Sequence, residues 1–283
     1  MLSIFNEQLS KIDEEVGATN SPNIPKLFSN FPLDEFGKLL LDIPQQYPHL
    51  QNYFPSMADI EVQKSWTGSH SDVLLHQSVA FIKTMIYGYS LITGKNIENA
   101  KVLDFGCGWG RLIRLLYKYV PVNHIYGLDP WDQSISICKK NQVKGHLEKS
   151  DFVPHSLPFA EQFNLIFAFS VFTHLSEKTT HTVLSTLRKY ISEDGVLVIT
   201  IRPKEYWHIH NNGEIATEML ALHNEQGFAF KPHNLPPIDG DITYGDTSLT
   251  LDYFEKNFPY WKIAAVECNN IDLYQVILFL KPS

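Results

Sequence analysis

The stretch Val102-Leu103-Asp104-Phe105-Gly106-Cys107-Gly108-Trp109-Gly110-Arg111 decides the fold of this 283-residue chain. A short apolar run ends in an acid, three glycines alternate with larger residues, and apolar residues at helical spacing follow at once. This order predicts a strand, a tight turn and the beginning of a helix. Glycine bends freely and has no side chain to keep a ligand away, and helix N-termini attract polar groups. The stretch therefore predicts a nucleotide-like ligand at the carboxyl end of the first strand of an open α/β sheet.

The spacing of the glycines distinguishes two kinds of nucleotide site. Proteins that bind NAD or FAD use the spacing G-x-G-x-x-G, whereas here the third glycine, Gly110, comes one residue early and Arg111 follows it. An acid, Asp104, stands two residues before the first glycine. The pattern D-x-G-x-G-x-G resembles the first motif of the class I S-adenosylmethionine (SAM) methyltransferases. That resemblance implies that the loop wraps the methionine end of SAM.

From Lys101 onward, expected strands alternate with expected helices. Apolar runs predict strands at residues 101–105, 124–128, 146–150, 163–169 and 195–201. Helical spacing of apolar residues predicts helices at 110–119, 132–141 and 176–190. Regular alternation of this kind predicts a parallel, doubly wound α/β sheet.

Two further strands are expected to close the sheet. Residues 260–268 and 273–280 are separated only by Asn269-Asn270-Ile271-Asp272, which is short enough for a hairpin. The last strand should therefore run antiparallel to its neighbour. An antiparallel C-terminal hairpin on a parallel sheet resembles the SAM methyltransferases and not the NAD-binding domains. The resemblance implies a Rossmann-like, seven-stranded sheet.

Residues 1–95 are expected to form an N-terminal helical and proline-rich arm, and residues 96–283 a SAM-binding domain. Residues 2–16 carry apolar residues at helical spacing, but six prolines between Ser21 and Pro55 leave room for short turns and one helix at 33–41. We expect this arm to lack a core of its own. It should lie on the catalytic domain, as a lid, or on a second copy of the chain.

A longer helix leads from the arm into the first strand. We expect residues 65–72 to form a loop that closes on this helix, with Ser71 or Asp72 as its N-cap and Gly94 as its C-terminal stop. Trp66 has two interpretations, either a cover over the cofactor or an aromatic side chain that packs the arm down.

Residues 203–248 form an insertion without a clear period, apart from a helical piece at 214–225. A helix is expected after it, at 249–257. The resemblance implies that the insertion caps the acceptor side, and Tyr244, Gly245 and Asp246 are further candidates for the acceptor pocket.

The resemblance assigns SAM contacts to residues at the ends of the strands, where ligands of such folds bind. These residues are Asp104, Gly106, Cys107, Gly108, Gly110, Asp129, Trp131, Asp151, Phe152 and Ser170. Asp129 would bind the ribose, because a carboxylate offers two acceptors to a diol; its alternative role is the N-cap of helix 132–141. Cys107 is either a reactive thiol or a small residue that fits a tight loop.

The resemblance also implies a separate role for each of the later residues. Trp131 would stack on the adenine ring, Asp151 would accept from its amino group and Phe152 would line its pocket. The segment Leu157-Pro158-Phe159 lies further from Asp151 than is usual in the family, and Asn164 stands where the family usually has aspartate. Ser170 would lie close to the methyl group that is transferred.

Three histidines are candidates for the chemistry. His174 follows the fourth strand and could act as a general base, or it could pack at a helix start with a hydrogen bond to a neighbouring loop. His208 and His210 have strand-like spacing and could contact the acceptor, serve as a base or occupy the surface. Metal binding is the weakest reading of the pair, because no cysteine and no compelling acid is near; we expect no metal.

Composition narrows the class of protein. Lys and Arg number 23 against 31 Asp and Glu, a formal net charge of −8, so nucleic acid is a poor candidate partner. Three widely spaced cysteines exclude a zinc knuckle and suit a reducing cytoplasm. Neither a signal peptide nor a membrane span is expected.

The leading hypothesis is a cytoplasmic SAM-dependent methyltransferase that modifies a small-molecule acceptor and releases S-adenosylhomocysteine. A SAM-binding scaffold or regulatory subunit without catalysis is the alternative, and a nicotinamide oxidoreductase is the least favoured reading. A homo-oligomer could form through the arm.

Overall fold

The computed structural model describes residues 2–209, 213–268 and 271–283. The chain divides into two compact units that do not follow the order of the sequence. Unit 1 contains Met1–Ile86, Asn96–Ala100 and Cys107–Lys149, and unit 2 contains Tyr87–Lys95, Lys101–Gly106 and Ser150–Ser283.

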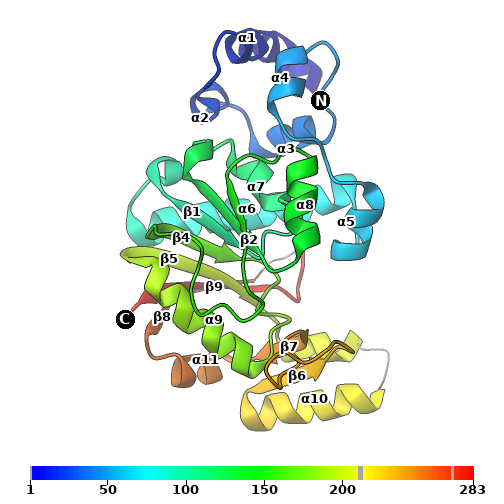
Figure 1. The fold of residues 1–283 in the computed structure, drawn as a ribbon, viewed down its shortest axis with the longest axis vertical. Coiled ribbons are helices and arrows are strands. Elements are labelled where there is room, and N and C mark those ends of the chain that lie inside the picture. The colour runs from blue at the N-terminus through cyan, green and yellow to red at the C-terminus, as the bar shows by residue number, and fades with distance from the viewer. Residues whose placement is uncertain (1, 210–212, 269–270) are drawn as a thin grey trace. The chain divides into compact units, whose positions relative to one another are not determined.

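The expected seven-stranded sheet is confirmed, with strand order β3-β2-β1-β4-β5-β9-β8 (Figure 1). Its strands are β1 (Val102–Phe105), β2 (Ile125–Asp129), β3 (His146–Lys149), β4 (Phe163–Ala168), β5 (Ile191–Ile201), β8 (Trp261–Cys268) and β9 (Val276–Pro282). The pairs β2–β3, β1–β4 and β4–β5 are parallel, whereas β5–β9 and β8–β9 are antiparallel. Every residue of β1 and β2 is buried, as the continuous apolar runs of parallel strands require.

The closing hairpin begins its last strand later than its sequence predicts. Asp272 accepts a hydrogen bond from the N–H of Tyr274 through its carboxylate and from the N–H of Gln275 through its carbonyl. This local turn holds the chain out of the sheet until Val276, and Leu273, expected in the strand, is exposed. Asn269 and Asn270, expected in the turn, lie outside the described residues.

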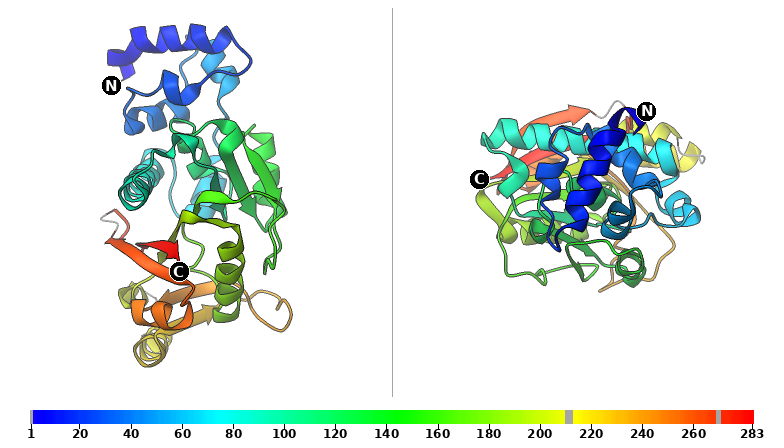
Figure 2. Two further views of the ribbon diagram at one scale, coloured as in Figure 1. Left: turned by 90° about the vertical axis from the view of Figure 1, so that its left-hand side faces the viewer. Right: turned by 90° about the horizontal axis from the view of Figure 1, so that it is seen from above.

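The arm holds more helix than expected. After a 3-10 turn at Leu2–Phe5 come α1 (Asn6–Gly17), α2 (Ile24–Leu27), α3 (Leu33–Leu41), α4 (Pro48–Tyr53) and α5 (Ile60–Thr67). Helices α1 and α3 are confirmed. The limit to one short helix was wrong for α2 and α4, because Pro25 and Pro48 sit in first turns, where proline is tolerated. Helix α1 lies against α4 (Figures 1 and 2).

The arm contributes an aromatic cluster to unit 1, which also contains residues 107–149. The Phe28 ring meets those of Phe31, Phe36 and Phe54 at centroid distances of 5.5, 4.9 and 5.9 Å, and all four side chains are buried. Within the same unit, Phe54 stacks on Tyr117 at 6.3 Å. The prolines limit the length of the helices, but aromatic side chains from different parts of the arm still pack against one another.

The remaining helices of the sheet layers follow the prediction closely. They are α6 (Ser71–Thr93), α7 (Arg111–Leu116), α8 (Asp132–Lys140), α9 (Glu177–Tyr190) and α11 (Leu251–Asn257). Gly94 ends α6 with φ of 69°, as expected. The loop expected at 65–72 begins later, because α5 continues to Thr67 and Gly68, with φ of 76°, ends it.

The insertion in unit 2 contains a hairpin that its sequence did not reveal. It runs through a 3-10 segment at Lys204–Ile209, α10 (Gly213–Gln226), β6 (Phe228–Pro232) and β7 (Gly245–Leu249). β6 and β7 pair antiparallel from Phe228↔Leu249 to Pro232↔Gly245, and α10 runs beside them (Figure 1). A small core of Trp207, Met219 and Ala229 joins the helix to the hairpin. Among the described residues, no helix is long and apolar enough to cross a membrane.

Candidate active site

The glycine loop after β1 needs its glycines for two different reasons. Gly106, Gly108 and Gly110 all have positive φ, at 84°, 53° and 76°. A side chain on Gly106 would come within 2.4 Å of Val171 in unit 2, so this position is closed by packing. A side chain on Gly108 would meet only the Trp66 ring, at 3.9 Å. The backbone of Gly108 therefore borders open space, as a loop that receives a ligand must.

Asp129, the last residue of β2, is held by the same loop. Its Oδ2 accepts from the N–H of Gly108 at 2.9 Å, and its Oδ1 accepts from the N–H of Trp131 at 3.0 Å. Burial raises the pKa of Asp129, partly offset by these hydrogen bonds. A carboxylate has about four acceptor positions, so positions remain for a ribose diol. The N-cap position of α8 belongs to Trp131, and the Asp129 side chain does not cap that helix.

Two tryptophans of unit 1 stand beside this carboxylate. The rings of Trp66 and Trp131 meet edge to face at 5.7 Å, and Trp131 remains 42% exposed. Trp66 also packs on the buried cluster of Ala58, Leu74 and Trp109, so it does hold the arm down. Its cover role stays a prediction.

Cys107 lies behind the loop. Its N–H donates to the carbonyl of Leu128 at 2.8 Å, and its side chain is 5% exposed. The thiols of Cys107 and Cys138 both approach the carbonyl oxygen of Gly108, at 3.9 and 3.3 Å. This setting favours the packing role over a reactive thiol, because reactive cysteines are partly exposed.

The cofactor candidates of unit 2 are either exposed or half-buried. Asp151 and Phe152 are exposed after β3. Ser170, with φ of 59°, donates its N–H to Thr200 Oγ1 at 2.7 Å, and its hydroxyl accepts from Gln275 Nε2 at 3.1 Å. Gln275 was not foreseen. Its Oε1 is buried and has no hydrogen-bond partner among the described residues.

His174, the first candidate base, has both ring nitrogens engaged. Its Nδ1 lies 2.7 Å from the carbonyl of Gly245, and its Nε2 lies 3.2 Å from Nη2 of Arg202. The carbonyl must accept and the guanidinium must donate, so the ring is neutral with its proton on Nδ1. Burial, followed by the positive charge of Arg202, lowers the pKa of His174 to about 4. The general-base role of His174 stays a prediction.

Arg202, directly before the insertion, forms a charged pair with Asp246 of the insertion. Arg202 Nη1 lies 2.6 Å from Asp246 Oδ1 and 2.8 Å from the carbonyl of Thr173. The Tyr206 hydroxyl donates to the same Oδ1 at 2.9 Å. Asp246 was among the pocket candidates, whereas the role of Arg202 as its partner was missed because the pair is far apart in sequence.

His233 is a second residue that the sequence did not single out. Its Nε2 lies 3.2 Å from Asp246 Oδ2, and its side chain is 43% exposed. The N–H of His233 donates to the carbonyl of Tyr244 at 3.1 Å, which continues the β6–β7 ladder by one pair. The other candidate, His208, is exposed, and His210 lies outside the described residues.

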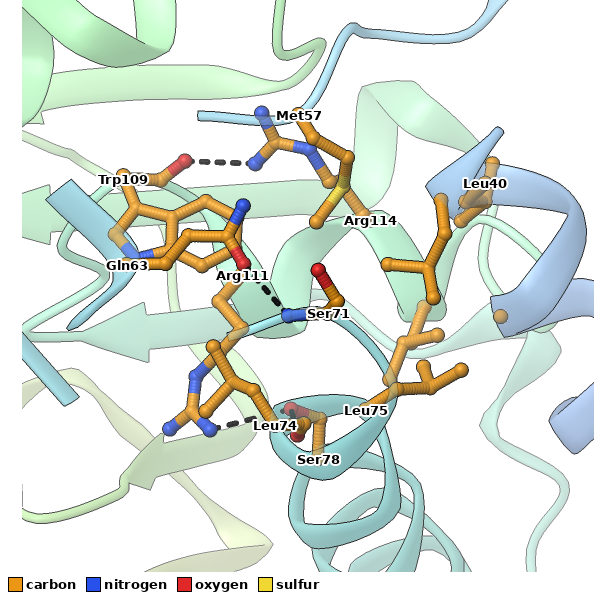
Figure 3. Close-up of a pocket in the computed structure, with 13 residues that line it drawn as sticks. Leu40, Met57, Gln63, Ser71, Leu74, Leu75, Ser78, Trp109, Arg111 and Arg114 are labelled. Carbon is orange, nitrogen blue, oxygen red and sulfur yellow. Dashed lines mark hydrogen bonds between the residues drawn. The ribbon is translucent and has the colours of Figure 1, made fainter. Parts of the chain in front are cut away.

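A separate small cavity lies within unit 1, lined by side chains from α3, α5, α6 and α7 (Figure 3). Its volume is only about 20 Å³, and most of its walls are apolar. Arg114 in its wall is almost fully buried and donates to the carbonyls of Trp109 and Ser56, both at 2.7 Å. Asp129 does not line this cavity. No metal site appears either, since no three His, Cys, Asp or Glu gather among the described residues.

Comparison with known proteins finds a matching family of domains. The family described as "Methyltransferase domain" matches residues 102–195, from β1 into β5. Residues 102–195 are therefore similar to methyltransferase domains. The match covers the glycine loop, Asp129 and His174, and ends before Arg202 and the insertion.

The curated relatives match only part of the chain. Over 138 residues the chain is 29% identical to a malonyl-[acyl-carrier protein] O-methyltransferase from Halalkalibacterium halodurans, covering 46% of this chain and 49% of that protein. The chain thus spans about half the length of the curated relatives that it matches.

Solved structures share the fold of this chain. A SAM-dependent methyltransferase from Clostridium acetobutylicum superposes with a TM-score of 0.53 at 12% identity, over 79% of this chain and 97% of that one. A glycopeptide N-methyltransferase with bound sinefungin superposes with a TM-score of 0.50 at 12% identity, over 73% and 94%. At this identity the likeness establishes the architecture alone.

Proposed function

We propose that this protein transfers a methyl group from SAM to a small-molecule acceptor and releases S-adenosylhomocysteine. One observation carries the proposal: Asp129 is held by the N–H groups of Gly108 and Trp131, beside a glycine that borders open space. A carboxylate fixed in this way has acceptor positions left for a diol, which a nucleoside ribose supplies.

The remaining cofactor residues keep the roles that the family resemblance gives them. Gly106, Gly108 and Gly110 shape the loop for the methionine end, and Trp131 offers an exposed ring for the adenine. Asp151, Phe152 and Ser170 complete the proposed set, together with Asp104. When bound, the cofactor supplies a methyl group already activated by its sulfonium. The protein then has mainly to hold the acceptor in line and to keep water out.

The acceptor belongs to the part of the chain beyond the matched domain. Arg202, which directly precedes the insertion, forms a polar network with Tyr206 and Asp246 of the insertion, with aromatic neighbours. The named relatives modify a malonyl group on a carrier protein and a glycopeptide, so the family tolerates unlike acceptors. We propose a small metabolite, in a cytoplasmic setting.

Labelled methyl transfer tests the proposal. Purified protein is mixed with methyl-labelled SAM and small-molecule fractions of a cell extract, and the products are separated. The expected result is a labelled small molecule together with S-adenosylhomocysteine. SAM binding without transfer to any fraction would instead support the non-catalytic scaffold, and absence of SAM binding would remove the proposed function.

A further inference from the structure

We propose that His233 is the general base of this methyltransferase, oriented by Asp246, and that the acceptor is a weakly acidic hydroxyl compound. This inference rests on the proposed function. It arises from a histidine and carboxylate pair in the insertion, outside the residues that match the methyltransferase domain.

Two residues besides His233 hold the Asp246 carboxylate in place. Its Oδ1 accepts from Arg202 Nη1 at 2.6 Å and from the Tyr206 hydroxyl at 2.9 Å. Arg202 is held in turn by the carbonyl of Thr173, and its guanidinium lies 3.9 Å from the Tyr206 ring centroid. The carboxylate therefore has little freedom, and its Oδ2 is left to face His233.

The contact with Asp246 sets the tautomer of His233. A carboxylate accepts, so Nε2 of His233 must donate, and a neutral ring then carries its lone pair on Nδ1. Among the residues that the structure describes, none bonds to this Nδ1, and the side chain is 43% exposed. The backbone is pinned by the N–H bond to the Tyr244 carbonyl. An oriented imidazole with one open nitrogen is what a general base requires.

His174 differs from His233 at each of these points. Its side chain is 16% exposed, its Nδ1 donates to a carbonyl, and its Nε2 accepts from Arg202. To take a proton from an acceptor, His174 would first have to give up a charged hydrogen bond. It would then carry its new charge beside a guanidinium. The geometry therefore favours His233 over His174 as the proton acceptor.

The chemistry of the pair points to a hydroxyl acceptor. A carboxylate acceptor is already ionised at neutral pH and needs no base, whereas a hydroxyl must lose its proton as it attacks. Three half-buried aromatic rings of unit 2, those of Tyr206, Tyr244 and Tyr274, border the network. They favour a flat, phenol-like acceptor.

Atoms and electrons balance in the step that this arrangement supports. The acceptor O–H proton moves to Nδ1 of His233 while the oxygen electron pair forms the new bond to the methyl carbon. The bond from that carbon to sulfur breaks with its electron pair on sulfur. His233 then carries a positive charge next to Asp246 and loses the proton to solvent.

Charged and polar groups surround His233. Asp246 contacts it directly, the rings of Tyr244 and His174 lie 5.5 and 6.5 Å away, and Arg202 and Tyr206 share the carboxylate. Loss of His233, or of Asp246, which orients it, should therefore lower methyl transfer.

His233→Gln tests the inference, with a panel of simple phenols and aliphatic carboxylates as probe acceptors. We expect the variant to lower kcat on the phenol that wild type methylates best by about 100-fold or more, with unchanged KM for SAM. Added imidazole should restore part of the rate to His233→Ala. Asp246→Asn should also lower kcat and should move the ring signals of His233 in an NMR titration.

Controls separate this inference from the proposed function. His155→Gln, at an exposed histidine of the same unit, should behave as wild type. If wild type binds S-adenosylhomocysteine and methylates a phenol, but His233→Gln does so equally fast, the base assignment is wrong and the proposed function stands. If only carboxylates are methylated, the acceptor class is wrong. If wild type binds neither SAM nor S-adenosylhomocysteine, both the proposed function and the base assignment are wrong.

Discussion

Replacement of Asp246 by asparagine should destabilise the protein in a pH-dependent way. The side chains of Asp246 and Arg202 are only 15% and 9% exposed, and their contact of 2.6 Å is joined by bonds from Tyr206 and His233. Breaking a buried ion pair from one side leaves the other charge uncompensated, at a cost of about 3–5 kcal/mol. Arg202 keeps its bond to the carbonyl of Thr173, so we expect a loss of about 2–4 kcal/mol at pH 7.

The pH dependence has a definite sign. Burial raises the pKa of Asp246, but Arg202 and the bonds from His233 and Tyr206 outweigh it, so the folded pKa lies below the usual value. A carboxyl that binds its proton less readily when folded stabilises the fold above its unfolded pKa of about 3.9. This stability is lost as pH falls through the folded pKa. The difference between wild type and Asp246→Asn should therefore be full at pH 7 and should shrink below about pH 4.

Urea denaturation at several pH values measures the effect as a change in midpoint at constant slope. Asp194→Asn serves as the matched control, because Asp194 pairs with Lys95 at the surface, where ion pairs contribute little. Equal midpoints for wild type and Asp246→Asn at pH 7 would refute the reasoning. So would a difference that persists unchanged well below pH 4.

Three other changes test separate parts of the account. Gly106→Ala places a side chain 2.4 Å from Val171 at a φ of 84°, which should lower the free energy of unfolding by about 2–4 kcal/mol. Adding Val171→Ala to this variant should recover only the part of the loss that is due to the clash, and urea midpoints measure both effects. Phe28→Ala removes the centre of the aromatic cluster of the arm and should cost about 3–5 kcal/mol, whereas an unchanged midpoint would mean that the arm contributes no core. The pKa of His174 is about 4 in the folded protein, so as pH falls this side chain binds a proton in the unfolded chain before it does so in the folded one. The free energy of unfolding should therefore fall by up to about 3 kcal/mol between pH 6.5 and pH 4. His174→Gln should flatten that slope in a pH series of urea midpoints.

The sequence predicts the central strands of the sheet well because they are buried runs, although β3 at the edge is mostly exposed. β1 and β2 are buried at every position, so their apolar runs are continuous, and the glycine loop marks the turn that follows. The start of β9 was misplaced by three residues, because Asp272 closes a local turn that competes with the ladder. The hydrophobic pattern of the sequence gives no sign of this competition between the turn and the strand.

The arm and the insertion were harder to predict because their contacts are not local. Prolines at first-turn positions start α2 and α4, although proline elsewhere in a helix breaks it. The β6–β7 hairpin brings Pro232 opposite Gly245 across residues that show no period. His233 therefore meets Asp246 through a pairing that the sequence does not signal, and the same is true of Arg202.

The candidate cofactor residues could be named from the sequence because each follows a predicted strand. The alternative role of Asp129 as a helix cap is removed by the position of Trp131 before α8. The roles of Asp151, Phe152 and Ser170 in binding, and those of His174 and His208 in catalysis, stay predictions, as do the lid and the boundary at residue 95.

Calorimetric titration with S-adenosylhomocysteine tests the central claim most directly, on wild type, Asp129→Ala and the control Asp132→Ala, which changes an exposed acid of α8. We expect wild type and Asp132→Ala to bind the nucleoside alike. Asp129→Ala should lose about 1.5–3 kcal/mol of binding, roughly 10-fold to 100-fold in affinity, the usual contribution of hydrogen bonds to a charged group. Wild type that ignores both SAM and S-adenosylhomocysteine, or an Asp129→Ala variant that binds as tightly as wild type, would contradict that claim.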